Sequence, residues 1–288
     1  MGGQKSKWAT HRGPQGARAA RPPRRRSSAL WLTIVAVVAI AAGWVLLPSS
    51  STQPTPAATV RSLRVNVLRK FSHDRSAFTQ GLVWHQGRLY ESTGQNGSST
   101  LRRVNPQTGD VEKRIDIAAD YFGEGLALVD RRLIMLTWKE ETAFVHDLDS
   151  FNRVDSYRYT GEGWGLAFDG RRLVMSNGSD ELTFRDPQTF EPRGVLRVTL
   201  RGSPLDRLNE LEWVEGAIYA NVWERDFIVR IDPETGRVTH QIDARGLLTR
   251  AESQGVDVLN GIAYNAETRT FYITGKWWPT MYEVTFVE

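Results

Sequence analysis

Five positions recur along the sequence at nearly equal spacing, and their side chains differ in a way that could build a reaction site. They are Gln80, Glu124, Trp164, Asn209 and Asn260, separated by 44, 40, 45 and 51 residues. Glu124 is the one carboxylate among them, with Gly123 and Gly125 on either side. Burial raises the pKa of a glutamate from about 4.3 towards neutrality, where it can accept and return a proton. Glu124 is therefore the candidate acid–base residue.

A second set of positions follows from the strands predicted after each of these. Counting the same offset along each repeat gives Gly94, Trp138, Gly178, Trp223 and Lys276. Neighbouring antiparallel strands bring the start of one beside the end of the next, so we expect both sets at one face. Together they offer one carboxylate, one amine, three amides and three tryptophans. Few convergent polar groups beside an aromatic wall are typical of a small-molecule pocket.

Purely structural roles are the alternative for several of these residues. Gln80 and Asn260 could satisfy backbone groups at strand ends, and the role of Asn260 stays open. Trp138 and Trp223 could be packing residues. We interpret Glu162, two positions before one of the recurring sites, as a turn residue.

The sequence around the recurring positions repeats although the positions themselves vary. Short β-prone runs alternate with Asn/Asp-Pro turns such as 105–110, 186–189 and 232–236, and no helical periodicity of useful length occurs. Four strands in each of five units predict an all-β fold, a five-bladed β-propeller. The aromatic residues four positions after the recurring sites are expected to fill the core between units: Trp84, Phe168, Trp213 and Tyr264.

The two ends of the repeat region are expected to meet. The last repeat supplies only three strand-like runs, whereas Leu63–Leu68 is an unassigned run with strand-like alternation before the first repeat. Pairing of this N-terminal strand with the last blade would remove both exposed edges. We therefore predict that the N-terminal strand closes the last blade.

The N-terminal region has a different composition from the repeats. Residues 1–28 carry all eight Lys/Arg residues of the first 58 positions, and residues 29–47 are uncharged and mostly apolar. We predict a basic cytoplasmic tail (1–28), a transmembrane signal anchor (29–47), a Ser/Thr/Pro linker (48–58) and a propeller catalytic domain (59–288). The alternative for 29–47 is a signal peptide cleaved near 39–41, and Arg25–Arg26 would also fit a twin-arginine signal. The propeller would lie on the periplasmic, extracytoplasmic side, or be secreted after cleavage.

Charge and residue content exclude several other classes of protein. Residues 59–288 hold 29 basic and 33 acidic residues, so we expect no nucleic-acid binding. The five histidines lie outside the recurring positions, and no glycine-rich phosphate loop precedes a helix. We expect no catalytic metal and no required cofactor, although Asp and Asn residues leave room for a structural calcium ion in the channel.

Six motifs resemble those of the glutaminyl-peptide cyclotransferases of the plant and bacterial type. They are Phe78-Thr-Gln-Gly-Leu82, Gly123-Glu-Gly-Leu126, Gly163-Trp-Gly-Leu166, Leu208-Asn-Glu-Leu-Glu-Trp213, Leu259-Asn-Gly-Ile-Ala-Tyr264 and Thr274-Gly-Lys-Trp-Trp-Pro279. The chain departs from the family pattern at Asn177 and Asn265, where aspartate is common. These departures concern local turn or channel contacts and not the chemistry.

The resemblance implies a propeller enzyme that converts the N-terminal glutamine of peptides and proteins to pyroglutamate and releases ammonia. It implies that Glu124 is the acid–base residue, that Trp138, Trp164 and Trp223 form a box, and that three further residues orient the amide: Gln80, Asn209 and Lys276. We expect a monomer, held to the membrane through residues 29–47. A non-enzymatic, membrane-anchored binding propeller is the alternative, and a metal-dependent propeller hydrolase is a third hypothesis.

Overall fold

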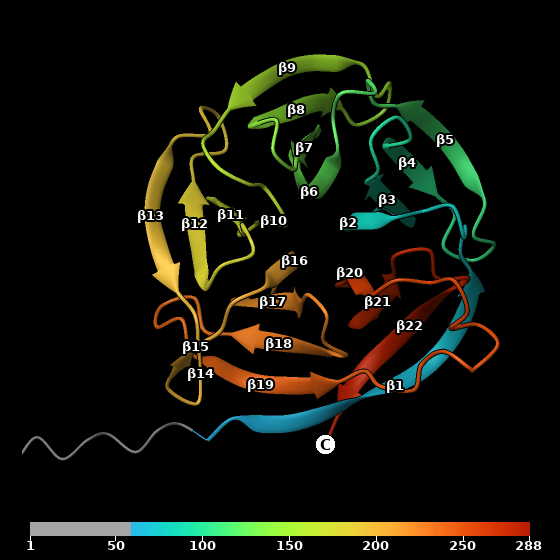
Figure 1. The fold of residues 1–288 in the computed structure, drawn as a ribbon, viewed down its shortest axis with the longest axis vertical. Helices are drawn as coiled ribbons and strands as arrows, with labels where there is room; N and C mark the ends of the chain where they lie inside the picture. The colour runs from blue at the N-terminus through green and yellow to red at the C-terminus, as the bar shows by residue number, and fades with distance from the viewer. Residues whose placement is uncertain (1–58) are drawn as a thin grey trace, which may run out of the picture. The chain divides into compact units, whose positions relative to one another are not determined.

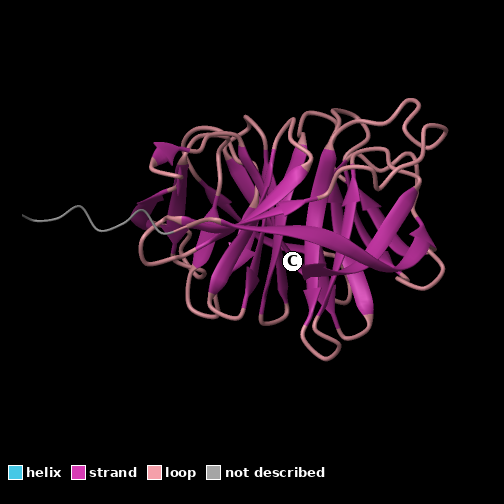
Figure 2. Cartoon of the chain, turned by 90° about the horizontal axis from the view of Figure 1, so that it is seen from below, coloured by secondary structure: helices cyan, strands magenta, loops and turns pink. Residues whose placement is uncertain are grey.

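The computed structural model describes residues 59–288, which fold entirely into strands and loops. No helix occurs in this range, and none of its segments forms a helix that could cross a bilayer. The predicted tail, membrane span and linker all precede residue 59, outside the described part of the chain. Figure 2 shows the strands running between two faces on which the loops gather.

The chain enters three four-stranded antiparallel sheets in succession. The first comprises β2 (Thr79–His85), β3 (Arg88–Thr93), β4 (Thr100–Val104) and β5 (Val111–Asp116); the second comprises β6 (Gly123–Val129), β7 (Arg132–Thr137), β8 (Thr142–Asp147) and β9 (Arg153–Arg158); the third comprises β10 (Leu166–Phe168), β11 (Leu173–Met175), β12 (Glu181–Arg185) and β13 (Pro192–Arg197). A small hairpin follows, formed by β14 (Thr199–Leu200) and β15 (Ser203–Pro204).

The remaining strands form one eight-stranded sheet in the order β16-β17-β18-β19-β1-β22-β21-β20. Their bounds are β16 (Leu208–Val214), β17 (Ala217–Val222), β18 (Phe227–Ile231), β19 (Val238–Asp243), β20 (Leu259–Asn265), β21 (Thr270–Gly275), β22 (Thr280–Val287) and β1 (Arg61–Ser72). In Figure 1 the sheets surround a common centre, with β2, β6, β10, β16 and β20 innermost. Each innermost strand contacts the innermost strands on both sides, which gives a closed, propeller-like arrangement.

The N-terminal strand β1 joins the two ends of this arrangement. It runs antiparallel to β22, from the pair Arg64–Val287 to the pair Ser72–Thr280. The predicted pairing of the first strand with the last repeat is therefore confirmed, and the strand is longer than the expected Leu63–Leu68. Its first residues, 61–64, also pair in parallel with 240–243 of β19, a contact that the sequence did not predict.

The Asn/Asp-Pro turns are built by side-chain hydrogen bonds, as their sequence predicts. Asn105 accepts the backbone N–H of Gln107 at 2.9 Å, and Asp186 and Asp232 accept equivalent bonds at 2.9 and 2.8 Å. Such Asx turns replace a backbone partner with the side-chain oxygen. They set the tight connections between β4 and β5, between β12 and β13, and between β18 and β19.

The apolar core lies between neighbouring sheets. Leu82 and Leu89 of the first sheet pack with Tyr272 of the eight-stranded sheet. The Trp84 ring stacks on the Tyr272 ring, with 4.9 Å between the ring centroids and 8° between the ring planes. The expected core role of the recurring aromatic residues is confirmed, because Phe168, Trp213 and Tyr264 pack against equivalent clusters. Burial of such side chains between the sheets, at roughly 25 cal/mol per Å² of apolar surface, holds the innermost strands together.

Candidate active site

Four of the five recurring positions lie at β-bulges near the start of an innermost strand. The pairing register shifts between Thr79 and Gly81, Gly123 and Leu126, Leu208 and Leu211, and Leu259 and Ile262. These shifts contain Gln80, Glu124, Asn209 and Asn260. A bulge frees a residue from the regular ladder and redirects its side chain. The fifth position, Trp164, precedes β10, which begins at Leu166.

Glycines beside these positions let the innermost strands approach each other closely. A Cβ atom on Gly81 would overlap the backbone of Leu126, and one on Gly165 would overlap the carbonyl group of Asn209. Gly125 is equally crowded by the backbone of the next strand. Only glycine permits this spacing, so the repeated glycine sets the width of the ring formed by the inner strands.

Glu210 stands where the other four repeats have glycine. Its carboxyl oxygens accept the backbone N–H groups of Leu82 at 3.2 Å and Ile262 at 2.8 Å. Burial raises its pKa well above the usual 4.5, and the charge of Glu212 adds to the rise. Glu210 thus ties β16 to β2 and β20, the strands that carry Gln80 and Asn260.

The two predicted sets of positions meet as expected. Backbone hydrogen bonds of 2.8–2.9 Å join the two sets. In each bond the N–H of a second-set residue donates to the carbonyl oxygen of the residue two positions before a recurring position. The donors are Gly94, Trp138, Trp223 and Lys276. At the two glycines of the second set, a neighbouring aromatic ring fills the space that a side chain would otherwise occupy. The ring of Phe122 lies against Gly94, and that of Trp164 lies against Gly178.

A cavity of about 330 Å³ opens between these residues. All seven residues that the sequence proposed for the site line it: Gln80, Glu124, Trp138, Trp164, Asn209, Trp223 and Lys276. Four further residues complete its lining: Phe78, Gln95, Phe122 and Asp257. Phe78 and Phe122 stand two positions before Gln80 and Glu124, so the same period could have identified them.

Glu124 is buried and 5% exposed. Gln80 Nε2 donates a hydrogen bond of 3.0 Å to its Oε1 atom. Burial raises the pKa of Glu124 well above 4.5; the charge of Lys276 opposes the rise, and those of Glu140 and Glu162 add to it. A carboxyl group with a raised pKa is suited to accepting a proton and returning it.

Lys276 is the cation of the cavity and is 4% exposed. Its Nζ atom lies 4.7 Å from the centroid of the Phe78 ring. Burial lowers its pKa from 10.5, although the charges of Glu124 and Asp257 favour the protonated form. A cation–π contact likewise favours the charged amine. The cavity therefore combines one buried acid with one buried base.

The amide side chains form a chain that leads to Glu124. Asn260 Nδ2 donates to the Thr79 carbonyl at 2.9 Å and to Gln80 Oε1 at 3.3 Å, and Gln80 donates in turn to Glu124. Asn260 is fully buried and orients Gln80, which answers the question that the sequence left open. Asn209 Oδ1 is buried without a hydrogen-bond partner among residues 59–288. A substrate N–H group could satisfy it.

The tryptophans form a connected wall. The rings of Trp164 and Trp223 pack edge to face, with 5.7 Å between the ring centroids and 89° between the ring planes. The indole N–H groups of Trp138 and Trp164 both donate to Glu162 Oε2, at 2.8 and 2.9 Å. The interpretation of Glu162 as a mere turn residue is therefore wrong. Its hydrogen bonds reach two different repeats, which local turn chemistry does not reveal.

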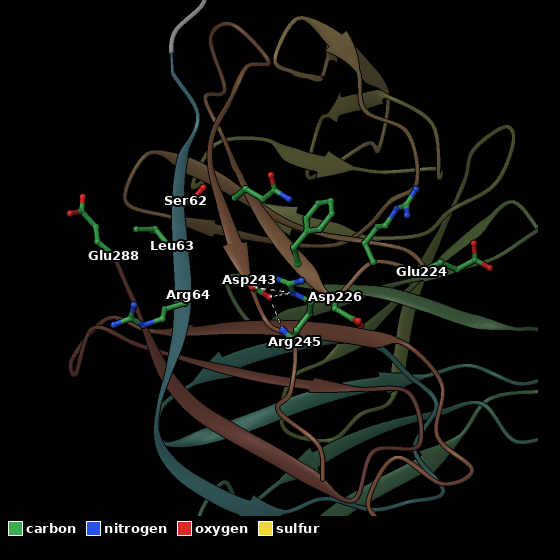
Figure 3. A pocket seen from close by; sticks show the side chains of 11 residues that line it. Ser62, Leu63, Arg64, Glu224, Asp226, Asp243, Arg245 and Glu288 are labelled. Atoms are coloured by element: carbon green, nitrogen blue, oxygen red, sulfur yellow. Dashed lines mark hydrogen bonds and ion pairs between the residues drawn. The ribbon is translucent and has the colours of Figure 1, made fainter. Parts of the chain in front are cut away.

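A larger hollow of about 700 Å³ is lined by residues of β1 and β19 and by none of these side chains. Figure 3 shows Asp243 and Arg245 joined to each other within it, with Glu224 and Glu288 at opposite ends. Its lining mixes acids and bases at the protein surface and contains none of the recurring residues. The smaller cavity, with its buried carboxyl group, is the candidate active site. Within 59–288 no group of three His, Asp or Glu side chains is arranged to ligate a metal ion.

Comparison with known proteins agrees with this geometry. A sequence profile described as glutamine cyclotransferase matches residues 37–286. The chain is 39% identical over 226 residues to a glutaminyl-peptide cyclotransferase of Arabidopsis thaliana, a match that covers 76% of this chain and 70% of the plant protein. The crystal structure of Myxococcus xanthus glutaminyl cyclase matches with a TM-score of 0.75 and 39% identity, covering 80% of this chain and 99% of the bacterial one. The chain therefore belongs to the glutamine cyclotransferase family.

Proposed function

We propose that the protein is a glutaminyl-peptide cyclotransferase, which converts the N-terminal glutamine of peptides and proteins to pyroglutamate and releases ammonia. Its family and the names of its two similar proteins support this activity. The observation that carries the proposal is a single buried acid, Glu124, in a cavity that also holds Lys276 and three tryptophans.

The reaction needs one proton to move from one nitrogen to another. The neutral α-amine attacks the carbon of the side-chain carboxamide, so that an N–C bond forms and an electron pair moves to the carbonyl oxygen. Glu124 accepts the proton released by the attacking nitrogen and returns it to the amide nitrogen. The carbonyl group then reforms, the old C–N bond breaks, and ammonia leaves. A carboxyl group with a raised pKa suits both transfers.

Charge builds on the carboxamide oxygen during the attack. Lys276 would stabilise this charge, because its ammonium group is buried beside Glu124 and therefore acts in a poorly hydrated site. Gln80 and Asn209 would orient the carboxamide. Gln80 is held by Asn260, and Asn209 Oδ1 has no hydrogen-bond partner within residues 59–288.

The tryptophan wall would fold the glutamine side chain back on its own amine. Cyclisation is intramolecular, so confinement of the reacting groups supplies much of the acceleration. Trp138, Trp164 and Trp223 line the cavity and contact one another or their neighbours edge to face. The reaction in this scheme requires no cofactor, because the acid and the cation belong to the chain. A structural calcium ion in the channel is compatible with it.

The decisive experiment incubates the full chain with a glutamine-initiated peptide and follows the loss of one ammonia by mass spectrometry. The same peptide with an acetylated amine is the control, since it cannot attack its own side chain. We expect conversion of the first peptide only. Folded protein that converts neither would refute the enzyme proposal and favour the non-enzymatic binding propeller.

We propose further that residues 59–288 form five blades, with β1 completing a last blade of β20, β21 and β22. The pairing of β1 with β22 supports this count. We also propose that residues 29–47 anchor a monomeric enzyme to the membrane, after the basic tail 1–28 and before the linker 48–58, with the catalytic domain on the periplasmic side. The uncharged run after Arg24–Arg26 supports the anchor. Protease accessibility of the domain in intact cells and in spheroplasts would test its placement.

A further inference from the structure

One carboxylate connects two walls of the cavity that come from different sheets. Glu162 Oε2 accepts the indole N–H of Trp138 at 2.8 Å and that of Trp164 at 2.9 Å. Trp138 directly follows β7 of the second sheet, and Trp164 precedes β10 of the third. Glu162 therefore fixes the relative position of two side chains that no shared strand holds together.

The backbone around Glu162 is itself held in place. Gly161 has a φ of +87° and donates its N–H to Glu141 at 2.8 Å. Gly163 donates its N–H to the carbonyl group of Trp138 at 2.9 Å, and a Cβ atom there would overlap the Tyr159 hydroxyl group. Because both neighbours are constrained, the carboxylate cannot drift from the indoles without a change in this loop.

The charge of Glu162 is balanced at its other carboxyl oxygen, Oε1. Lys139 Nζ lies 3.7 Å from Glu162 Oε1 and 3.9 Å from the centroid of the Trp138 ring. Lys139 is 57% exposed at its side chain, so this ion pair is weak by itself. Hydrogen bonds from a neutral N–H to a carboxylate are stronger than those between neutral groups. The two indole bonds therefore dominate the arrangement.

The hydrogen bonds of the two indole N–H groups to Glu162 also determine which contacts Trp138 and Trp164 can make with a substrate. An indole has one hydrogen-bond donor and no acceptor in its ring plane. With both donors on Glu162, Trp138 and Trp164 have only ring surface left for the substrate. Ring surface attracts cations and N–H groups and gives no hydrogen bond to a carbonyl oxygen.

We propose that Glu162 is a positioning residue that holds the side chains of Trp138 and Trp164 in one fixed arrangement. Because their indole N–H groups are bonded to Glu162, the ring surfaces of this wall bind the nitrogen-bearing side of the substrate. This inference rests on the proposed function. The carboxamide oxygen is then left to Lys276, the cation that lines the same cavity. Glu162 contributes binding and orientation, whereas Glu124 exchanges the proton.

The test compares two substitutions of Glu162 with a matched control. Glu162→Leu removes the acceptor, and Glu162→Gln keeps one acceptor oxygen without the charge. Glu224→Gln is the control, because Glu224 directly follows the third wall tryptophan and pairs with Arg207 but accepts no indole N–H among the described residues. Each full-length protein is examined by tryptophan emission without substrate and by kcat and KM with a glutamine-initiated peptide.

We expect Glu162→Leu to raise KM about tenfold, with a smaller change in kcat and an altered emission spectrum. The KM of Glu162→Gln should lie between that of Glu162→Leu and that of the original protein. Glu224→Gln should keep KM within about twofold and leave the emission spectrum unchanged. Unchanged KM and emission in Glu162→Leu would overturn the proposal, as would an equal rise in KM in the control. If the unmodified protein converts no peptide, the proposed function fails, while the emission spectra still show whether Glu162 holds the indoles.

Discussion

Gln80 donates a hydrogen bond of 3.0 Å to Glu124, and Asn260 in turn holds Gln80. These three residues come from the first, second and last repeats of the described chain. The carboxyl group at the centre of the proposed chemistry is thus oriented by strands that are distant in sequence. Its environment combines burial, one nearby cation and a fixed amide donor.

Replacement of Glu124 by Gln should abolish turnover and leave the fold intact. The amide keeps the shape of the side chain and cannot exchange a proton at neutral pH, so kcat should fall by about a hundredfold or more. The free energy of unfolding should change little, because a neutral amide avoids the desolvation of a buried carboxylate. Ammonia release and urea unfolding measure the two effects. Turnover close to that of the original protein would dismiss Glu124 as the acid–base residue.

Lys276→Met should move the acidic limb of the pH–rate profile to higher pH. Lys276 lowers the pKa of Glu124 by its charge, against the larger effect of burial, so its loss raises that pKa further. A base with a higher pKa becomes deprotonated only at higher pH. The profile of kcat/KM reports the shift. Lys276→Arg keeps the charge and should keep the acidic limb near its original position; an equal displacement in both variants would argue against a charge effect.

A second buried pair should make stability depend on pH. His73 Nε2 lies 3.0 Å from Glu91 Oε1, and His73 Nδ1 lies 2.7 Å from the carbonyl oxygen of Trp278. Burial alone would lower the pKa of His73, but the charge and hydrogen bond of Glu91 outweigh it and raise the pKa above 6.5. Protonated His73 therefore stabilises the fold fully below the unfolded pKa of about 6.5, and this contribution is lost as pH rises through the folded value.

His73→Asn should flatten this dependence. We expect the free energy of unfolding of the original protein to fall between about pH 6 and about pH 9 and that of the variant to fall less. His240→Asn is the control, since His240 is partly exposed and its pKa is lowered by burial. Urea unfolding at the two pH values measures the difference, and parallel losses in the original protein and His73→Asn would count against the pair.

Gly165→Ala should destabilise the ring of innermost strands. The added methyl group would overlap the carbonyl group of Asn209 on the next strand. Overpacking of this kind costs about 1–3 kcal/mol, and here it also displaces a residue of the cavity. Both the unfolding midpoint and kcat/KM should fall. A variant with the original midpoint would show that the strands can separate without cost.

A chelator should leave turnover unchanged. The proposed proton transfers use Glu124, and the proposed charge stabilisation uses Lys276, so no metal takes part in the chemistry. Ammonia release before and after incubation with EDTA measures the effect, and circular dichroism distinguishes loss of activity from unfolding. Loss of activity in a folded sample would contradict the metal-independent scheme.

The sequence predicted much of this arrangement because residues at equal spacing in the sequence occupy equivalent places in successive sheets. Equal spacing placed Gln80, Glu124 and Lys276 around one cavity, and the motifs identified the family, which the comparisons confirm. The period could not reveal the bridge from Glu162, because a hydrogen bond between repeats depends on loop path and side-chain rotamer. Nor could it predict the parallel pairing of β1 with β19, which involves only residues 61–64 and carries no distinct hydrophobic pattern.

The pairing of the first and last strands also sets an order of assembly. Asn66 donates to Thr285 across 219 positions of sequence. During synthesis β1 emerges first, yet its antiparallel partner β22 emerges last, so β1 must wait for nearly the whole domain. Contacts of such long sequence separation form slowly. Lys276 emerges just before β22, and we therefore expect catalytic competence to appear only when synthesis of the domain is almost complete.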